Sequence, residues 1–127
     1  MGGTVLLVDD SATIRSFLKV YVVGHNFDCV EAESGERALQ LARLMRLDLI
    51  IADIKMPGMD GFDFVRQLRS SERSDLKILP VILMTGDKAE MLRRRAMDVG
   101  ASDFLRKPFS TTELIEVFKK FLPVSRQ

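Results

Sequence analysis

Three acidic side chains stand directly after short aliphatic runs, where they could bind a cation together. Asp9 and Asp10 follow Val5–Val8, and Asp53 follows Leu49–Ala52. Continuous aliphatic runs of this length are typical of strands that are buried on both faces of a parallel sheet. The carboxyl ends of such strands lie at one edge of the sheet, where open α/β sheets bind their ligands. We therefore expect the three carboxylates to converge at that edge.

A hydroxyl group and an ammonium group are predicted at the same edge. Thr85 follows the aliphatic run Val81–Met84. Lys107 follows the short run Asp103–Arg106. Carboxylates this close repel one another unless a cation joins them or some of them are protonated. A few hard oxygen ligands suit Mg²⁺ or Mn²⁺, and the hydroxyl and ammonium suit an anion held against that ion. The set predicts a phosphoryl-transfer site, in which Asp53 could become an aspartyl-phosphate.

The elements that position these residues alternate along the chain between strand-sized runs and helical periods. A weaker strand is expected at Asp28–Glu31, and the segment Arg69–Lys77 is polar and expected to be a loop. Five helices are expected: one that Ser11 begins and Gly24 closes, one capped by Ser34, one with Phe62, Val65 and Leu68 inward, one over Lys88–Val99, and one after the capping box Ser110–Glu113.

These five strand-then-helix units predict an α/β fold. Their connections are short, and right-handed crossovers between the strands require a parallel sheet with helices on both faces. The doubly wound, flavodoxin-like strand order 2-1-3-4-5 fits five strands best. At 127 residues the chain is expected to form one domain, residues 1–127, with no second domain.

Composition excludes several classes of protein. The 19 Lys and Arg residues nearly balance the 18 Asp and Glu residues, which argues against direct binding to nucleic acid. The single cysteine, Cys29, excludes an internal disulfide and gives no sign of an oxidising compartment. No apolar run reaches the length of a membrane span, and no signal peptide is evident. We therefore expect a cytoplasmic protein without a membrane segment.

With these motifs in place, the chain resembles the receiver domain of two-component response regulators, the chemotaxis-regulator-like (CheY-like) family. The resemblance covers essentially the whole chain, and the order of its motifs makes it specific. It depends on Val8–Ser11, on Asp53–Gly61 with the sequence DIKMPGMDG, on Thr85-Gly86, and on Lys107–Phe109.

The resemblance implies that Asp53 accepts a phosphoryl group from the phosphohistidine of a sensor histidine kinase or a histidine phosphotransfer protein. Asp10, Asp53 and the backbone carbonyl of Lys55 would bind Mg²⁺ directly, and Asp9 would bind it through water. Thr85 and Lys107 would bind the phosphoryl oxygens. The bond before Pro108 would be cis. Such a protein is a phosphoacceptor switch rather than a turnover enzyme, although it can take phosphate from small donors and lose it unaided.

The resemblance also implies how the signal would leave the site. Thr85 would move toward the new negative charge, and the aromatic ring of Phe104 would fill the space. Phenylalanine lacks the hydroxyl of the commoner tyrosine, so the readout would depend on packing. The surface of Lys88–Val99, Phe104 and Ser110–Leu122 would then change its affinity for a downstream protein or a second copy. Phe104 could instead be an ordinary core residue, and Arg93–Arg95 a solvated helix face.

Two further residues invite a hypothesis about the lifetime of the phosphoryl group. Lys55 stands two residues after the acceptor and Asp87 two after Thr85. Lys55 could pair with the phosphoryl group or crowd the attacking water, and Asp87 could form a salt bridge with Lys55. Both could also be merely exposed.

Three other functions fit the sequence less well than the switch does. A dehalogenase-type phosphatase places a second acid two residues after its nucleophile, and that position is Lys55 here. A flavodoxin-like nucleotide binder needs a loop rich in Gly, Ser or Thr after the first strand, and Asp9-Asp10 would repel phosphate. A receiver used only for docking would normally lack part of the acidic set. The pattern leaves open whether the chain stands alone or is part of a longer regulator.

Overall fold

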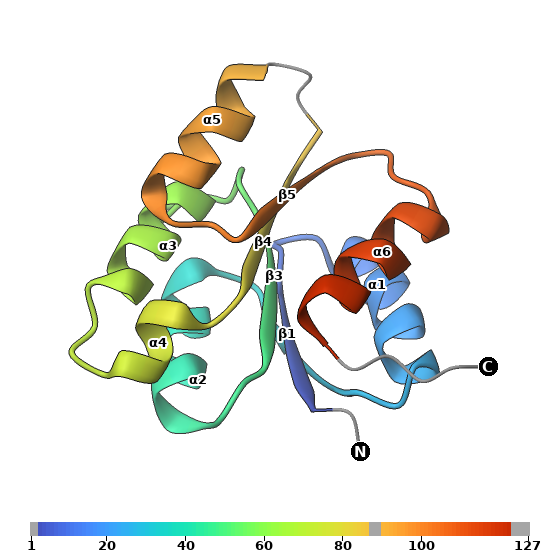
Figure 1. Ribbon diagram of the computed structural model, residues 1–127, viewed down its shortest axis with the longest axis horizontal. Coiled ribbons are helices and arrows are strands. Elements are labelled where there is room, and N and C mark those ends of the chain that lie inside the picture. The colour runs from blue at the N-terminus through green and yellow to red at the C-terminus, as the bar shows by residue number, and fades with distance from the viewer. Residues whose placement is uncertain (1–2, 87–89, 123–127) are drawn as a thin grey trace.

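A five-stranded parallel sheet forms the centre of the computed structural model, which describes residues 3–86 and 90–122. The strand order is β2-β1-β3-β4-β5, as predicted (Figure 1). The strands are β1 (Thr4–Val8), β2 (Asp28–Ala32), β3 (Leu49–Asp53), β4 (Val81–Thr85) and β5 (Asp103–Arg106).

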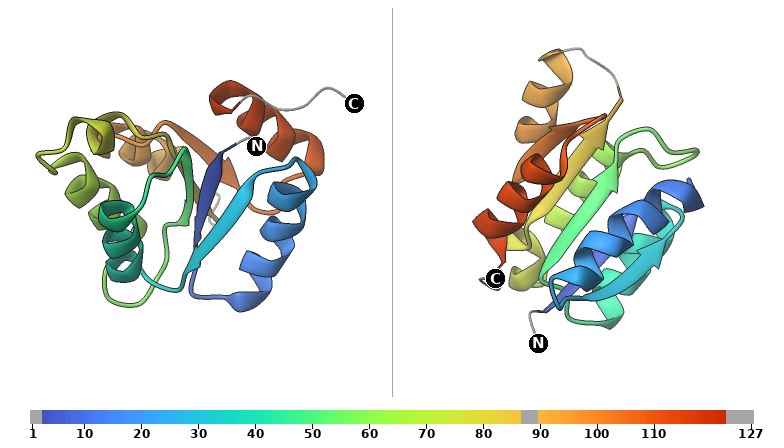
Figure 2. Two further views of the ribbon diagram at one scale, coloured as in Figure 1. Left: turned by 90° about the horizontal axis from the view of Figure 1, so that it is seen from below. Right: turned by 90° about the vertical axis from the view of Figure 1, so that its right-hand side faces the viewer.

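Helices cover both faces of the sheet, so the molecule has three layers (Figure 2). The helices α1 (Ala12–Gly24) and α6 (Thr111–Phe121) pack on one face. The other face is covered by α2 (Gly35–Leu44), α3 (Gly61–Arg69), α4 (Ser74–Ile78) and α5 (Glu90–Val99). No helix in the described part of the chain is long and apolar enough to span a membrane.

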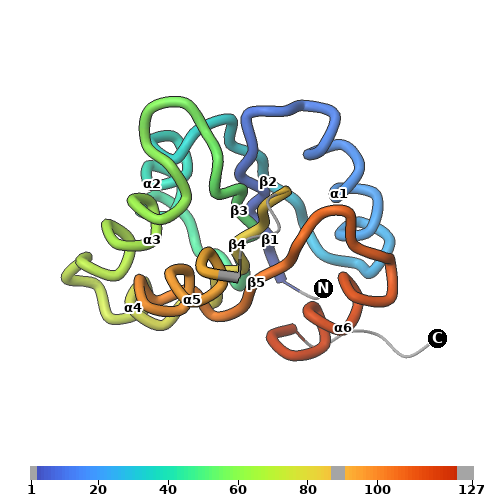
Figure 3. The backbone as a smooth tube through the Cα atoms, turned by 90° about the horizontal axis from the view of Figure 1, so that it is seen from above, coloured from blue at the N-terminus to red at the C-terminus, as the bar shows by residue number. Residues whose placement is uncertain are grey.

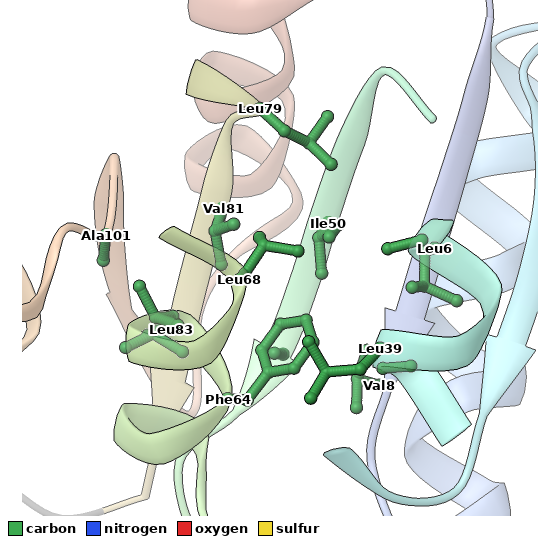
Figure 4. Packing of buried hydrophobic residues seen from close by; sticks show 14 of the residues in the cluster. Leu6, Val8, Leu39, Ile50, Phe64, Leu68, Leu79, Val81, Leu83 and Ala101 are labelled. Atoms are coloured by element: carbon green, nitrogen blue, oxygen red, sulfur yellow. The ribbon is translucent and has the colours of Figure 1, made fainter. Parts of the chain in front are cut away.

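Alternating side chains of each strand enter the two cores that these layers enclose. Leu6 and Val8 contact the core beneath α2 and α3, together with Ile50 and Phe64 (Figure 4). Leu7 belongs to the core beneath α1 and α6. Each such buried side chain stabilises the fold by about 1.5–3 kcal/mol relative to an exposed one. The buried aliphatic residues therefore hold the strand ends in fixed positions.

The strand register brings the predicted site residues level. Val8 pairs with Ala52 across β1 and β3, so Asp9 and Asp53 each stand one residue beyond that pair. Thr85 pairs with Arg106 across β4 and β5, so Lys107 stands one residue beyond that pair. Figure 3 looks at the molecule from this side of the sheet.

The structure corrects two predictions about helices. The segment Arg69–Lys77 is not entirely a loop, because it contains most of α4, so the described chain has six helices rather than five. The polar character of the segment concealed one buried anchor, Leu76. Gly24 is the last helical residue of α1 and not the residue just beyond the helix that ends it. The left-handed conformation that often ends a helix is adopted by Asn26, with φ of 67°. The predicted helix start at Lys88 lies outside the described residues.

The predicted helix caps are confirmed. Ser11 accepts a hydrogen bond from the Ile14 N–H, and Ser34 accepts one from the Arg37 N–H. The Ser110 hydroxyl accepts from the Glu113 N–H at 3.1 Å, while the Glu113 carboxylate accepts from the Ser110 N–H at 2.9 Å. These bonds satisfy backbone donors in the first turn of each helix.

Candidate active site

The three predicted carboxylates meet at the carboxyl edge of the sheet. One oxygen from each of Asp9, Asp10 and Asp53 lies within 4.8 Å of the others. Asp9 is 1% exposed and Asp53 is 7% exposed, whereas Asp10 is exposed to solvent. The cluster therefore has two buried acids and one acid that solvent can reach.

Lys107 supplies a positive charge to this cluster. Its Nζ atom lies 3.5 Å from Asp53 Oδ1 and 3.8 Å from Asp9 Oδ2. Its backbone N–H donates to the Thr85 carbonyl at 2.7 Å, which fixes the start of the loop after β5. The Lys107–Pro108 bond is cis, as the resemblance implies. Lys107 directly follows β5, so its side chain reaches past the end of β4 to the carboxylates.

The carboxylate of Asp9 is held by the first turn of α1. Its Oδ1 accepts a hydrogen bond from the Ser11 N–H at 2.9 Å. Its Oδ2 is buried and accepts no hydrogen bond within the described chain. A buried carboxylate oxygen without a donor is costly, so this atom is suited to a cation or to a water molecule that a cation binds.

Burial and mutual repulsion raise the pKa values of the two buried acids. Loss of solvent is the largest cause of the raised pKa of Asp53, followed by the negative charge of Asp9. Loss of solvent also raises the pKa of Asp9, against a hydrogen bond from Ser11 that lowers it. The Lys107 charge lowers both pKa values but does not offset the increase. A divalent cation would provide the missing charge.

The contacts by which two residues support the site could not be predicted from the sequence. Arg15 donates from Nη1 to the Asp9 carbonyl at 2.6 Å and from Nε to Glu31 at 3.0 Å. A Cβ atom at Gly61 would lie 2.7 Å from the Asp53 carbonyl oxygen. Glycine at the start of α3 therefore permits the close approach of that helix to the end of β3. Gly61 closes the motif Asp53–Gly61, but nothing in that motif indicates this contact.

The remaining predicted site residues are Thr85, Lys55 and Asp87. Thr85 is fully buried at the end of β4 and takes part in a hydrogen bond or other polar contact. Lys55 is exposed and also takes part in a polar contact. Asp87 lies outside the described residues, so the predicted Lys55–Asp87 pair is not described.

Phe104 lies in the core beside α5. Its ring is 3% exposed, and the Arg93 guanidinium carbon lies 5.0 Å above its centre. The guanidinium of Arg95 lies over Phe62 in the same way, at 4.2 Å. The basic run of α5, which could have been only a solvated face, thus contributes two cation–π contacts.

Comparisons with known proteins agree with this geometry. A family model described as the response regulator receiver domain matches residues 5–119. ResD, a transcriptional regulatory protein of Bacillus subtilis, is 36% identical over 118 residues, which are 93% of this chain and 47% of ResD. PhoB, the phosphate regulon regulator of Pseudomonas aeruginosa, is 34% identical over 96% of this chain and 52% of its own. The chain spans about half the length of these curated relatives.

Solved structures give the same result. The chemotaxis protein CheY4 of Vibrio cholerae superposes with a TM-score of 0.87 at 31% identity, covering 95% of this chain and 99% of CheY4. The receiver domain of the sensor histidine kinase PA1611 of Pseudomonas aeruginosa has a TM-score of 0.85 at 25% identity, covering 95% of this chain and 98% of that one. That structure holds a magnesium ion in its active-site cleft.

Proposed function

The chain belongs to the response regulator receiver domain family, and from this premise we propose that Asp53 accepts a phosphoryl group from a phosphohistidine. The donor would be a sensor histidine kinase or a histidine phosphotransfer protein. The observation that carries the proposal is the cluster of three carboxylates with the Lys107 ammonium 3.5 Å from Asp53. Asp53 is the last residue of the central strand β3 and lies closer to that ammonium than Asp9 does, at 3.5 Å against 3.8 Å.

The transfer exchanges one bond to phosphorus for another. A carboxylate oxygen of Asp53 attacks the phosphorus atom, and the bond between phosphorus and the histidine nitrogen breaks. The imidazole leaves with the electron pair of that bond. It leaves as a neutral group when its other ring nitrogen carries a proton. Lys107 and Thr85 bind the phosphoryl oxygens and stabilise the charge that they carry.

The acidic cluster is suited to hold the Mg²⁺ that the reaction would require. Asp10 and Asp53 would bind the ion directly with the Lys55 backbone carbonyl, and Asp9 would bind it through water. The buried Oδ2 of Asp9, which accepts no hydrogen bond from the described residues, fits this arrangement. When bound, Mg²⁺ would neutralise charge on the transferring group.

Phosphorylation would be read out at the surface formed by α5, β5 and α6. Thr85 would follow the phosphoryl oxygens, and the Phe104 ring, which packs beside α5, would adjust to the vacated space. The Arg93 guanidinium of α5 lies over the buried Phe104 ring, so a movement of the ring would act on α5 directly. A change there would alter the affinity of this surface for a downstream protein or a second copy of the chain.

Incubation with acetyl phosphate and Mg²⁺, followed by intact-protein mass spectrometry, tests the proposal. We expect an adduct of one phosphoryl group that is lost on standing, and that is missing in Asp53→Asn or with excess EDTA. Asp63→Asn is a matched control, because Asp63 is an acid on α3 that pairs with Arg66 away from the cluster. An adduct that persists in Asp53→Asn would overturn the assignment of the acceptor.

Thermal unfolding tests the ion separately. An ion that binds only the folded state stabilises it by about 1.4 kcal/mol when its free concentration is about ten times Kd. We expect Mg²⁺ to raise Tm, EDTA to reverse the rise, and Asp10→Ala to weaken it. An equal rise in wild type and in Asp10→Ala would exclude the carboxylate cluster as the binding site.

A further inference from the structure

A cleft of about 660 Å³ opens at the opposite end of the molecule from the carboxylate site. Its lining comes from the end of α2, the short helix α4 and the residues that lead into β3 and β4. Figure 1 shows α2 and α4 near each other at this end of the sheet. Asp48 lines the cleft and stands five residues before Asp53. At about 3.3 Å per strand residue, the cleft is roughly 16 Å from the acceptor. It therefore belongs to neither the phosphoryl site nor the surface of α5, β5 and α6.

The walls of the cleft are fixed by hydrogen bonds. Arg73 donates from Nη1 to the Arg43 carbonyl at 2.9 Å, which ties α4 to the end of α2. The same guanidinium binds the Asp75 carboxylate through Nη2 at 2.7 Å and Nε at 3.1 Å. Arg69 donates to the carbonyls of Leu76 and Leu79 at the other end of α4. The cleft is thus a formed feature of the fold.

Large apolar side chains stand in solvent at the rim of this cleft. Leu44 is 78% exposed and Ile78 is 80% exposed, and both line the cleft. In the described part of the chain only Met91 on α5, at 81%, is a more exposed large apolar residue. Exposed apolar groups that are gathered around a cleft with a polar margin mark an interaction site.

Positive charge without a partner surrounds these apolar groups. Arg43 and Arg46 line the cleft, and neither side chain makes an ion pair within the described chain. The two acids of the lining are already engaged: Asp48 accepts from the Thr4 N–H at 2.8 Å, and Asp75 pairs with Arg73. The Asp48 carboxylate keeps its charge, but the arginines of the lining, Arg43, Arg46 and Arg73, outnumber its two acids, so the lining carries a net positive charge.

We propose that this cleft binds an acidic amphipathic segment of a partner protein. Apolar side chains of the segment would pack between Leu44 and Ile78, and its carboxylates would pair with Arg43 and Arg46. A second copy of the chain fits less well, because a two-fold contact places the same patch on both sides and would bring the arginines of the two copies together. The proposal does not depend on phosphorylation of Asp53.

Titration with synthetic peptides, followed by ¹⁵N NMR of the chain, tests the proposal. The probe is a helical peptide of about 18 residues with leucines on one face and glutamates elsewhere, and its partner carries lysine in place of each glutamate. We expect the acidic peptide to shift the amide signals of residues 43–48 and 74–79, and to bind more weakly as salt is added. Beryllofluoride, which mimics phosphorylation, should leave this affinity unchanged.

Four variants separate this site from non-specific binding. Leu44→Ser with Ile78→Ser should weaken binding at least about tenfold, as should Arg43→Glu with Arg46→Glu. Val20→Ser and Lys19→Glu, exposed residues on α1, are the matched controls and should bind like wild type. Equal binding of the lysine peptide, equal weakening by the controls, or concentration-dependent self-association that Leu44→Ser abolishes would overturn the proposal.

Discussion

The Lys107 ammonium lies 3.5 Å from the Asp53 carboxylate, yet the pKa of Asp53 remains above its ordinary value. Burial is the main cause, and the charge of Asp9 adds to it. Lys107 also faces Asp9, so one ammonium is shared by two buried acids. Ionised Asp53 is therefore less stable in the folded chain than in the unfolded chain, and its burial lowers the stability of the fold at neutral pH.

Asp53→Asn should raise the free energy of unfolding at pH 7.5 in the absence of divalent ions. Because the pKa of Asp53 is higher in the folded chain, protonation of this carboxyl stabilises the fold. That stabilisation is fully present below the unfolded pKa of 3.8 and is lost as pH rises through the folded pKa. The advantage of the variant should therefore shrink as pH falls toward 4. Urea unfolding at several pH values measures it, and a variant that is less stable at pH 7.5 would contradict the reasoning.

Gly61→Ala should destabilise the chain and also slow phosphorylation. Its Cβ atom would lie 2.7 Å from the Asp53 carbonyl oxygen and 2.8 Å from the Ile54 Cα, so the backbone that carries Asp53, the proposed acceptor, must shift. Overpacking of this kind costs about 1–3 kcal/mol. Gly24→Ala is the control, because nothing lies within 4 Å of its Cβ position and alanine favours the end of α1. Equal stability of Gly61→Ala and wild type would show that α3 can move away.

Most of the fold could be predicted from the sequence because its main signals are local. The aliphatic runs of β1, β3 and β4 are fully buried, so their composition directly reflects their position. Serine caps mark the starts of α1, α2 and α6. The helix α4 gave no such signal, because its five residues are too few for a period and its N-cap, Arg73, makes no side-chain cap bond. It is held by tertiary contacts that a linear pattern does not contain.

The candidate site divides in the same way. Asp9, Asp53 and Lys107 could be brought together from the sequence because strand ends in a parallel sheet share one edge. The roles of Arg15 and Arg93 could not be predicted from the sequence. Arg15 binds a backbone carbonyl 6 residues away, and Arg93 lies over a ring on another element. Arginines occur on most of the helices, and only the folded arrangement decides which of them contact a neighbouring element.

Arg69→Ala should destabilise the chain by about 2–4 kcal/mol. The Arg69 guanidinium donates to three backbone carbonyls, those of Leu76, Leu79 and Gly100, at 2.7–3.0 Å. Removal of the side chain would leave these acceptors without their donor and release α4. Arg66→Ala on the same helix loses only an exposed pair with Asp63 and should change stability by less than about 1 kcal/mol. Chemical unfolding compares the two variants, and similar losses would refute the special role of Arg69.

We propose that the Lys55 side chain pairs with the phosphoryl group on Asp53, so Lys55→Asn should shorten the lifetime of that group. Lys55 is exposed, so the pairing is screened by solvent and worth about 0.2–1 kcal/mol. This range corresponds to a rate of dephosphorylation about 1.5- to 5-fold higher. Loss of the adduct is followed by mass spectrometry after removal of acetyl phosphate, with the distant Lys77→Asn as the control. An unchanged lifetime would remove Lys55 from the mechanism.

Arg93→Ala and Phe104→Leu should not have additive effects on stability. The guanidinium of Arg93 lies 5.0 Å above the Phe104 ring, and a cation–π contact at a partly exposed position contributes about 0.5–1 kcal/mol. A double-mutant cycle from urea unfolding should therefore give a coupling energy in this range. Arg94 provides the control cycle, since it stands beside Arg93 on α5 and, among the described residues of this helix, only Arg93 and Arg95 lie over rings. If the two cycles give the same coupling energy, the α5 surface does not sense Phe104 through this contact, and the proposed readout must pass through the backbone of β5 instead.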